Sequence, residues 1–244
     1  MKLKSLRDKF PKQLPPISKE DQDICDDFMK VWHEKLDGDK RYSLIESFNH
    51  KYSTNSPHYY AMRQKHIRTL ELGAGIGNQI SYEDLSHQDY YAVEIRENMI
   101  LALQQSYPLV KTVKGSVEDR FDFSDDFFHR VNVVHVLEHL PNLPACIDEV
   151  ARVLDADGIF QVVVPCDPGT FYEICRSVST RRLFRKRYGK DFDIFIKREH
   201  INSPEEITGV ILDRFDLVER KFFPFKVPIV NANLCIGMTF KLKK

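Results

Sequence analysis

The chain of 244 residues carries no net charge, because 36 Lys and Arg residues balance 36 Asp and Glu residues. The chain as a whole therefore has no electrostatic reason to bind a polyanion such as nucleic acid or an acidic membrane surface. Any charged partner would have to bind a local patch.

Several sequence signatures are also missing. The five cysteines form no C-x-x-C pair and no Cys/His spacing typical of zinc sites, so we expect reduced thiols and no metal site. The basic N-terminus is followed by no apolar signal region, and nowhere do about 18 apolar residues run together. We therefore expect a cytoplasmic protein without a membrane span.

What the chain does contain is an alternation of short β-rich runs and helical patterns between Ile67 and Pro165. The runs are almost uniformly apolar, which suits parallel strands covered on both faces. Repeated strand-helix-strand units predict an open α/β sheet with right-handed crossovers. The predicted strands are Ile67–Leu72, Tyr90–Glu94, Val110–Val113, Val131–Val136 and Ile159–Val164.

The two flanks have different patterns. An N-terminal helix is predicted to begin at Ser18-x-x-Asp21, and a capping box from Ser203 to Glu206 predicts a late helix. Residues 215–223 and 234–242 are predicted to form an antiparallel strand pair. We expect four parts: a cap region at 1–64, a cofactor-binding core at 65–165, a substrate-binding or lid insertion at 166–204, and a C-terminal completion of the same domain at 205–244.

The stretch from Gly73 to Asn78 ends the first predicted strand in a glycine-rich turn. With a helix predicted next, its backbone N–H groups would face a ligand, although tight turns need glycine in non-binding proteins too. A dinucleotide fingerprint would require Gly or Ala at position 78. The side chain of Asn78 therefore disfavours NAD, which makes an NAD-dependent oxidoreductase a minor alternative.

The pattern E-x-G-x-G-x-G, from Glu71 to Gly77, resembles the first motif of the class I S-adenosylmethionine-dependent methyltransferases. The resemblance continues through Tyr91–Ile95, Val136–Pro141, Glu149–Gly158 and His200–Glu206, in order along the chain. It implies a Rossmann-like, doubly wound sheet of seven strands, mostly parallel with an antiparallel last strand, together with a helical N-terminal cap. It also implies S-adenosylmethionine as cofactor and S-adenosylhomocysteine as product.

The resemblance further implies which residues bind the cofactor. Glu94 lies about 20 positions after Gly73, the interval at which a carboxylate reaches a ribose diol. Ser116 stands where the family usually has Asp, so contacts to adenine would come from the Val117 backbone or from Glu118. The implied set is Glu71, Gly73, Ala74, Gly75, Gly77, Asn78, Glu94, Ile95, Ser116, Val117, Glu118, His135 and Val136.

Methyl transfer from a sulfonium mainly requires that the nucleophile be positioned in line with the methyl group. A hydroxyl acceptor would be helped by a nearby base, and histidine has the suitable unperturbed pKa. His139 and His200 are the catalytic candidates; the alternative is that each is bonded to backbone with a structural role.

A basic run from Arg176 to Lys190 contains no acidic residue. Arg181, Arg182 and Arg185 are the candidates for binding an anionic substrate such as a phosphorylated or carboxylated metabolite. The alternative is a solvated helix face.

Together these patterns predict methylation of a small-molecule acceptor, most simply at oxygen. The alternatives are an N-methyltransferase, a macromolecule-modifying methyltransferase, and a catalytically silent S-adenosylmethionine-binding scaffold. Nucleic acid is disfavoured as a substrate because the chain has no N/D-P-P-Y-type motif and no room for an appended RNA-binding module.

Overall fold

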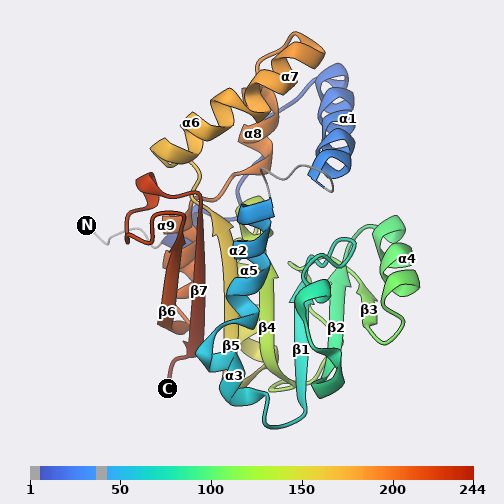
Figure 1. The fold of residues 1–244 in the computed structure, drawn as a ribbon, viewed down its shortest axis with the longest axis vertical. Helices are drawn as coiled ribbons and strands as arrows, with labels where there is room; N and C mark the ends of the chain where they lie inside the picture. The colour runs from blue at the N-terminus through green and yellow to red at the C-terminus, as the bar shows by residue number, and fades with distance from the viewer. Residues whose placement is uncertain (1–5, 37–42) are drawn as a thin grey trace.

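The computed structural model describes residues 6–36 and 43–244, which form one central sheet with helices on both faces (Figure 1). The strand order is β3-β2-β1-β4-β5-β7-β6. Every neighbouring pair is parallel except those of β7, which runs antiparallel to β5 and β6. The predicted α/β fold is thus confirmed. The strands are β1 (Ile67–Leu72), β2 (Gln88–Glu94), β3 (Lys111–Lys114), β4 (Phe128–Val134), β5 (Leu154–Pro165), β6 (Phe215–Phe223) and β7 (Cys235–Leu242).

One face of the sheet holds the main apolar core. Here Val131 and Val133 of β4 pack with α5 (Leu143–Val153) and α9 (Pro204–Ile211). Both helices were predicted, and α9 begins with the predicted capping box between Ser203 and Glu206. Alternate residues of a strand point to opposite faces, so the neighbours of these valines face the other side of the sheet.

That other face buries polar side chains beneath α2 (Ser43–Thr54) and α3 (Pro57–Met62), with α4 (Glu97–Ser106) packing nearer β2 and β3. At its centre Arg130 Nη1 lies 2.8 Å from Glu83 Oε2, with both side chains fully buried. Arg130 Nε also donates to Gln161 Oε1 at 2.7 Å, and its guanidinium lies over the Tyr59 ring. Because each charge is paired and hydrogen-bonded, this pair can be buried inside the fold.

A helical cap lies above the carboxyl ends of the parallel strands (Figure 1). Its helices are α1 (Lys19–Leu36), α6 (Thr170–Val178), α7 (Thr180–Tyr188) and α8 (Asp193–Glu199). Aromatic side chains from α1, α7 and the α8 region, including Phe28, Phe184 and Phe195, form a separate small core.

The predicted division into four parts stays a prediction. Within residues 1–64, α1 packs in this cap, whereas α2 and α3 lie on the sheet. Residues 1–5 and 37–42 of the predicted cap region lie outside the described residues.

The prediction of a helix directly after the glycine-rich turn is wrong. Residues 75–79 form turns, followed by two short 3-10 helices, η2 (Ile80–Tyr82) and η3 (Leu85–His87). Ser81 and Asp84 bond local backbone groups instead, and such bonds compete with helix formation. The backbone N–H groups of the turn therefore do not belong to a helix N-terminus.

Three further 3-10 helices complete the described fold: η1 (Leu6–Lys9), η4 (Leu137–His139) and η5 (Val230–Ala232). All five cysteines have free thiols. Across 6–36 and 43–244, no helix combines the length and the apolar character needed to cross a membrane.

Candidate active site

The glycine-rich turn places three glycines in the left-handed region, with φ of +69° at Gly73, +57° at Gly75 and +95° at Gly77. The Gly73 and Ala74 N–H groups donate to the Val93 carbonyl at 2.9 and 3.1 Å, which fixes the turn against β2. A Cβ added to Gly75 would meet no atom within 4 Å, so the turn is open there. At Gly73 it would lie 2.4 Å from Val136, so the turn lies directly against the chain after β4.

Glu94 lies beside the glycine-rich turn with only 3% of its surface exposed. Its Oε2 accepts from the Gly75 N–H at 2.9 Å, and Oε1 accepts from the Ile95 and Arg96 N–H groups. Gly115, at the end of β3, donates its N–H to the Glu94 carbonyl, and a Cβ there would also meet no atom within 4 Å. The ends of β1, β2 and β3 thus offer two open glycines around one carboxylate; the ribose contact of Glu94 stays a prediction.

Glu71 is buried and accepts a hydrogen bond from the Tyr90 hydroxyl at 2.9 Å. Burial is the main cause that raises the pKa of Glu71 to about 8. By contrast, Asn78 and Ile95 are exposed at the outer edge of the site. A direct role of these three residues in cofactor binding stays a prediction.

The buried Glu71 should make stability depend on pH. The folded pKa of Glu71, about 8, lies above the ordinary value of 4.5. The contribution of Glu71 to the free energy of unfolding is therefore fully present below about pH 4.5 and is lost as pH rises through about 8. We expect Glu71→Gln to remove this loss. The unfolding free energy of the variant relative to that of the wild type should therefore increase from pH 5 to pH 8. Urea unfolding without cofactor checks this. Parallel pH curves for the two proteins would contradict it.

The segment after β3 supplies the other predicted adenine contacts. The Val117 side chain is buried in the apolar core, while Ser116 Oγ accepts from the Glu118 N–H at 3.2 Å. The Glu118 carboxylate accepts from the Asn142 backbone N–H and so anchors the loop before α5. A contact between Glu118 and adenine stays a prediction, and the same carboxylate already anchors the loop at Asn142.

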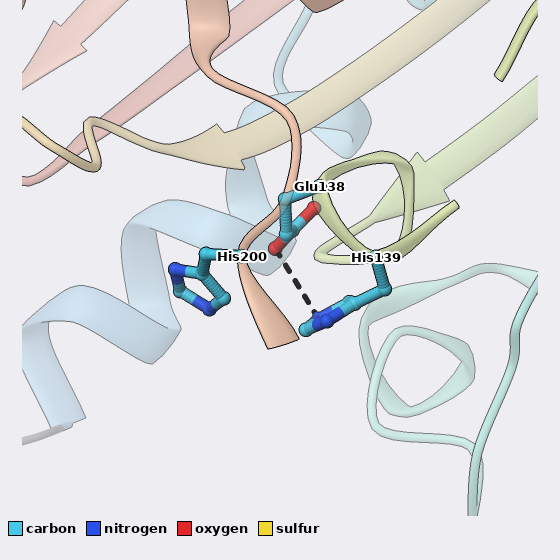
Figure 2. A group of neighbouring side chains, drawn as sticks. All are labelled: Glu138, His139 and His200. Atoms are coloured by element: carbon cyan, nitrogen blue, oxygen red, sulfur yellow. Dashed lines mark ion pairs between the residues drawn. The ribbon is translucent and has the colours of Figure 1, made fainter. Parts of the chain in front are cut away.

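The structure brings His139 and His200 together around Glu138, as Figure 2 shows. The predicted strand Val131–Val136 in fact ends at Val134, and His135 adopts a φ of +53° that turns the chain into η4. Glu138 Oε1 lies 3.1 Å from His135 Nδ1 and 3.8 Å from His139 Nε2. The His139 and His200 ring centroids are 5.3 Å apart. Because Val136 touches Gly73, this cluster borders the predicted cofactor site.

Carboxylates surround the two histidines. His200 Nδ1 lies 2.7 Å from Asp167 Oδ2, which also accepts from Arg176 Nη1 at 2.5 Å. His139 Nδ1 lies 3.4 Å from Glu199 Oε2. Asn202 donates to the Leu137 and Leu140 carbonyls at 2.8 Å each, which joins the His200 segment to the loop of Glu138.

The electrostatics of the cluster follow from these contacts. Burial alone would raise the pKa of Glu138, but the His135 hydrogen bond and the nearby imidazoles lower it to about 2. Burial would lower the pKa of His139, but Glu199 and Glu138 raise it. For Asp167, the effect of burial is outweighed by His200 and Arg176, which lower its pKa. The cluster is therefore a network of coupled charges.

Sequence reasoning did not select Glu138, Asp167, Arg176 or Glu199 as site residues. The available signals were the position of Asp167 just after β5 and the adjacency of Glu138 and Glu199 to the two candidate histidines.

The basic run is partly neutralised. Arg181 pairs with Asp193, Arg187 with Asp27, and Lys190 with Glu20 and Asp21, so acids of α1 and α8 face several of its cations. Arg181, Arg182 and Arg185 line a surface hollow with Ser177 and Val178.

Comparisons with known proteins agree with this geometry. A family model described as a methyltransferase domain matches residues 70–162. No curated protein matches the chain.

Solved structures share the fold. A TehB-like SAM-dependent methyltransferase from Corynebacterium glutamicum has a TM-score of 0.55 at 16% identity, covering 90% of this chain and 98% of that one. A SAM-dependent methyltransferase from Methanosarcina mazei has a TM-score of 0.57 at 17% identity, covering 77% and 97%. One from Aquifex aeolicus has a TM-score of 0.55 at 13% identity, covering 86% and 96%.

The family match identifies a methyltransferase domain at residues 70–162, and the ordered motifs and the seven-stranded sheet agree with the fold of S-adenosylmethionine-dependent methyltransferases, whose cofactor is S-adenosylmethionine.

Proposed function

We propose that this methyltransferase transfers its methyl group to an oxygen of a small molecule. The observation that carries the proposal is the cluster of Glu138, His139 and His200 on the chain just after Val136, which lies against Gly73 of the glycine-rich turn. Imidazole nitrogens and a carboxylate can accept a hydrogen bond from an acceptor hydroxyl and hold its oxygen in place. The residues proposed to bind the cofactor are the set implied by the family resemblance, with Glu94 on the ribose.

The cofactor supplies an activated methyl group on a positively charged sulfur. The chain's own task is then to orient the acceptor oxygen and to receive or release its proton. Asn202 and Asp167 support this task, because they hold the Glu138 loop and the His200 ring in one arrangement.

The cap and the insertion at 166–204 are proposed to select the acceptor. Arg176 of α6 connects the insertion with the cluster, because Asp167 bonds both Arg176 and His200. The free thiols favour a reducing compartment, and we propose a cytoplasmic enzyme.

Turnover assays test the proposed acceptor class. Release of S-adenosylhomocysteine is measured with matched small molecules that carry either a hydroxyl or an amine at the same position, and mass spectrometry locates the added methyl group. Methylation of hydroxyls alone is the expected result. Methylation confined to the amines would overturn oxygen as the acceptor, and cofactor binding without turnover of any compound would favour the silent scaffold.

The anionic-substrate proposal concerns Arg181, Arg182 and Arg185. We expect the double variant Arg182→Glu/Arg185→Glu to raise the KM for an anionic acceptor about tenfold or more while kcat changes little, because uniform binding is lost. The matched control is Lys51→Glu, which reverses an exposed charge on α2, outside the insertion. An unchanged KM in the double variant would leave the solvated helix face as the explanation.

A further inference from the structure

We propose that Glu138, His139 and His200 form a binding site for a divalent transition-metal ion of the Zn²⁺ kind, which would hold the acceptor oxygen. This inference deepens the proposed oxygen methylation and rests on it for the role of the ion. The sequence predicted no metal site, because the ligands come from the loop after β4 and from the segment before α9 (Figure 2).

The geometry of the three side chains suits such an ion. One ligand atom from each residue lies within 4.8 Å of the other two. Ligands at about 2.1 Å from a tetrahedral ion lie about 3.4 Å apart, so the side chains would close by about 1 Å. Two imidazoles and one carboxylate are a ligand set typical of catalytic zinc, with a fourth position left for water or substrate.

The two oxygens of the buried Glu138 carboxylate have different surroundings. The Glu138 side chain is 1% exposed, and its Oε1 faces His135. Its Oε2 is buried and has no hydrogen-bond donor in the part of the chain that the structure describes. Oε1 is the oxygen nearer His139, at 3.8 Å from Nε2, so an ion between the histidines would bind Oε1 (Figure 2). It would also satisfy Oε2 if the carboxylate turned to bind it through both oxygens.

The surroundings of both histidines also match a metal site. His200 Nδ1 faces Asp167 and His139 Nδ1 faces Glu199, which leaves the Nε2 atom of each ring for an ion. In metal sites the second ring nitrogen of a ligating histidine usually bonds a carboxylate, which fixes the tautomer and the orientation of the ring. Arg176 in turn holds Asp167 in place.

The chemistry balances without a further reactant. The ion binds the acceptor hydroxyl and lowers its pKa, so that its proton leaves to water. The oxygen then forms a bond to the methyl carbon, and the carbon–sulfur bond breaks with its electron pair going to sulfur. The products are a methyl ether and S-adenosylhomocysteine.

Metal binding to the full chain without an affinity tag tests the site. After treatment with a chelator and dialysis, Zn²⁺ is titrated by calorimetry, and Co²⁺ is followed by its visible absorption bands. We expect binding of a single ion to the wild type and affinities about 100-fold weaker or worse in Glu138→Gln and His200→Asn. Asp167→Asn should weaken binding by about 10–100-fold, because it acts through His200. The control is His66→Asn, an exposed histidine paired with Asp89 outside the cluster.

Thermal unfolding and S-adenosylhomocysteine binding are measured for each variant, so that loss of the fold is separated from loss of the ion. If Glu138→Gln fails to fold, His139→Gln replaces it. No binding of Zn²⁺ or Co²⁺ to the wild type, or equal binding by the folded cluster variants, would overturn the site and indicate a network of ion pairs. Metal binding without hydroxyl methylation would overturn the proposed function but leave the site standing. Hydroxyl methylation unaffected by chelation would leave the proposed function standing and overturn the proposed role of the ion in holding the acceptor oxygen.

Discussion

Replacing Glu94 by alanine is expected to weaken S-adenosylmethionine binding by about 100-fold. The proposed ribose contact uses two hydrogen bonds to one carboxylate, and hydrogen bonds to charged groups contribute about 1.5–3 kcal/mol each. Removing both therefore costs about 3 kcal/mol, which corresponds to this loss of affinity. Isothermal titration calorimetry with S-adenosylhomocysteine and S-adenosylmethionine measures the effect.

Glu94 also holds the turn itself, since its carboxylate accepts from the Gly75, Ile95 and Arg96 N–H groups. Glu94→Gln separates the two roles, because an amide oxygen keeps part of the backbone bonding but cannot accept from both ribose hydroxyls. The matched control is Glu97→Ala, an exposed acid near Glu94 that pairs with Lys114. A folded Glu94→Ala protein that binds within threefold of the wild type would show that the ribose assignment is wrong.

The largest effect on stability is expected for Arg130→Met. The methionine leaves the carboxylate of Glu83 buried without its cation, and breaking such a pair costs about 3–5 kcal/mol. For a chain of this size the corresponding fall in Tm is about 6–20 °C. Urea unfolding and thermal denaturation measure both quantities.

Two further variants identify the cause. Adding Glu83→Gln to Arg130→Met should restore part of the stability, because it removes the unpaired charge. Arg63→Met breaks a more exposed ion pair, with Asp84, and should cost no more than about 1 kcal/mol. If Arg130→Met costs as little as Arg63→Met, the buried pair is not an important source of stability.

Local sequence patterns predicted what depends on neighbouring residues. The runs of residues at 67–72 and 215–223 predicted β1 and β6 with their observed bounds. A nearly continuous apolar run or an alternating run already determines which faces of a strand are buried. The capping box predicted the start of α9, since Ser203 and Glu206 satisfy each other's backbone groups. The glycine spacing and Asn78 favour S-adenosylmethionine over NAD from the sequence alone.

Other features required contacts between distant segments. The helix expected after the glycine-rich turn does not form, since Gln79 and Glu83 turn inward to buried partners, including Arg130, 47 residues from Glu83. The basic run looked free of acids in sequence, yet α1 brings Asp21 and Asp27 against it. Neither pairing is visible in a linear pattern.

The sequence by itself determined the parallel α/β sheet, the glycine-rich turn and the cofactor class, because backbone conformation and strand burial depend on residues close in the chain. Only the tertiary structure decided the proposed acceptor side of the site. It folds the loop after β4 against the segment before α9, and so places His139 and His200 on one buried carboxylate. The charge and chemistry of that cluster exist only where the two segments meet.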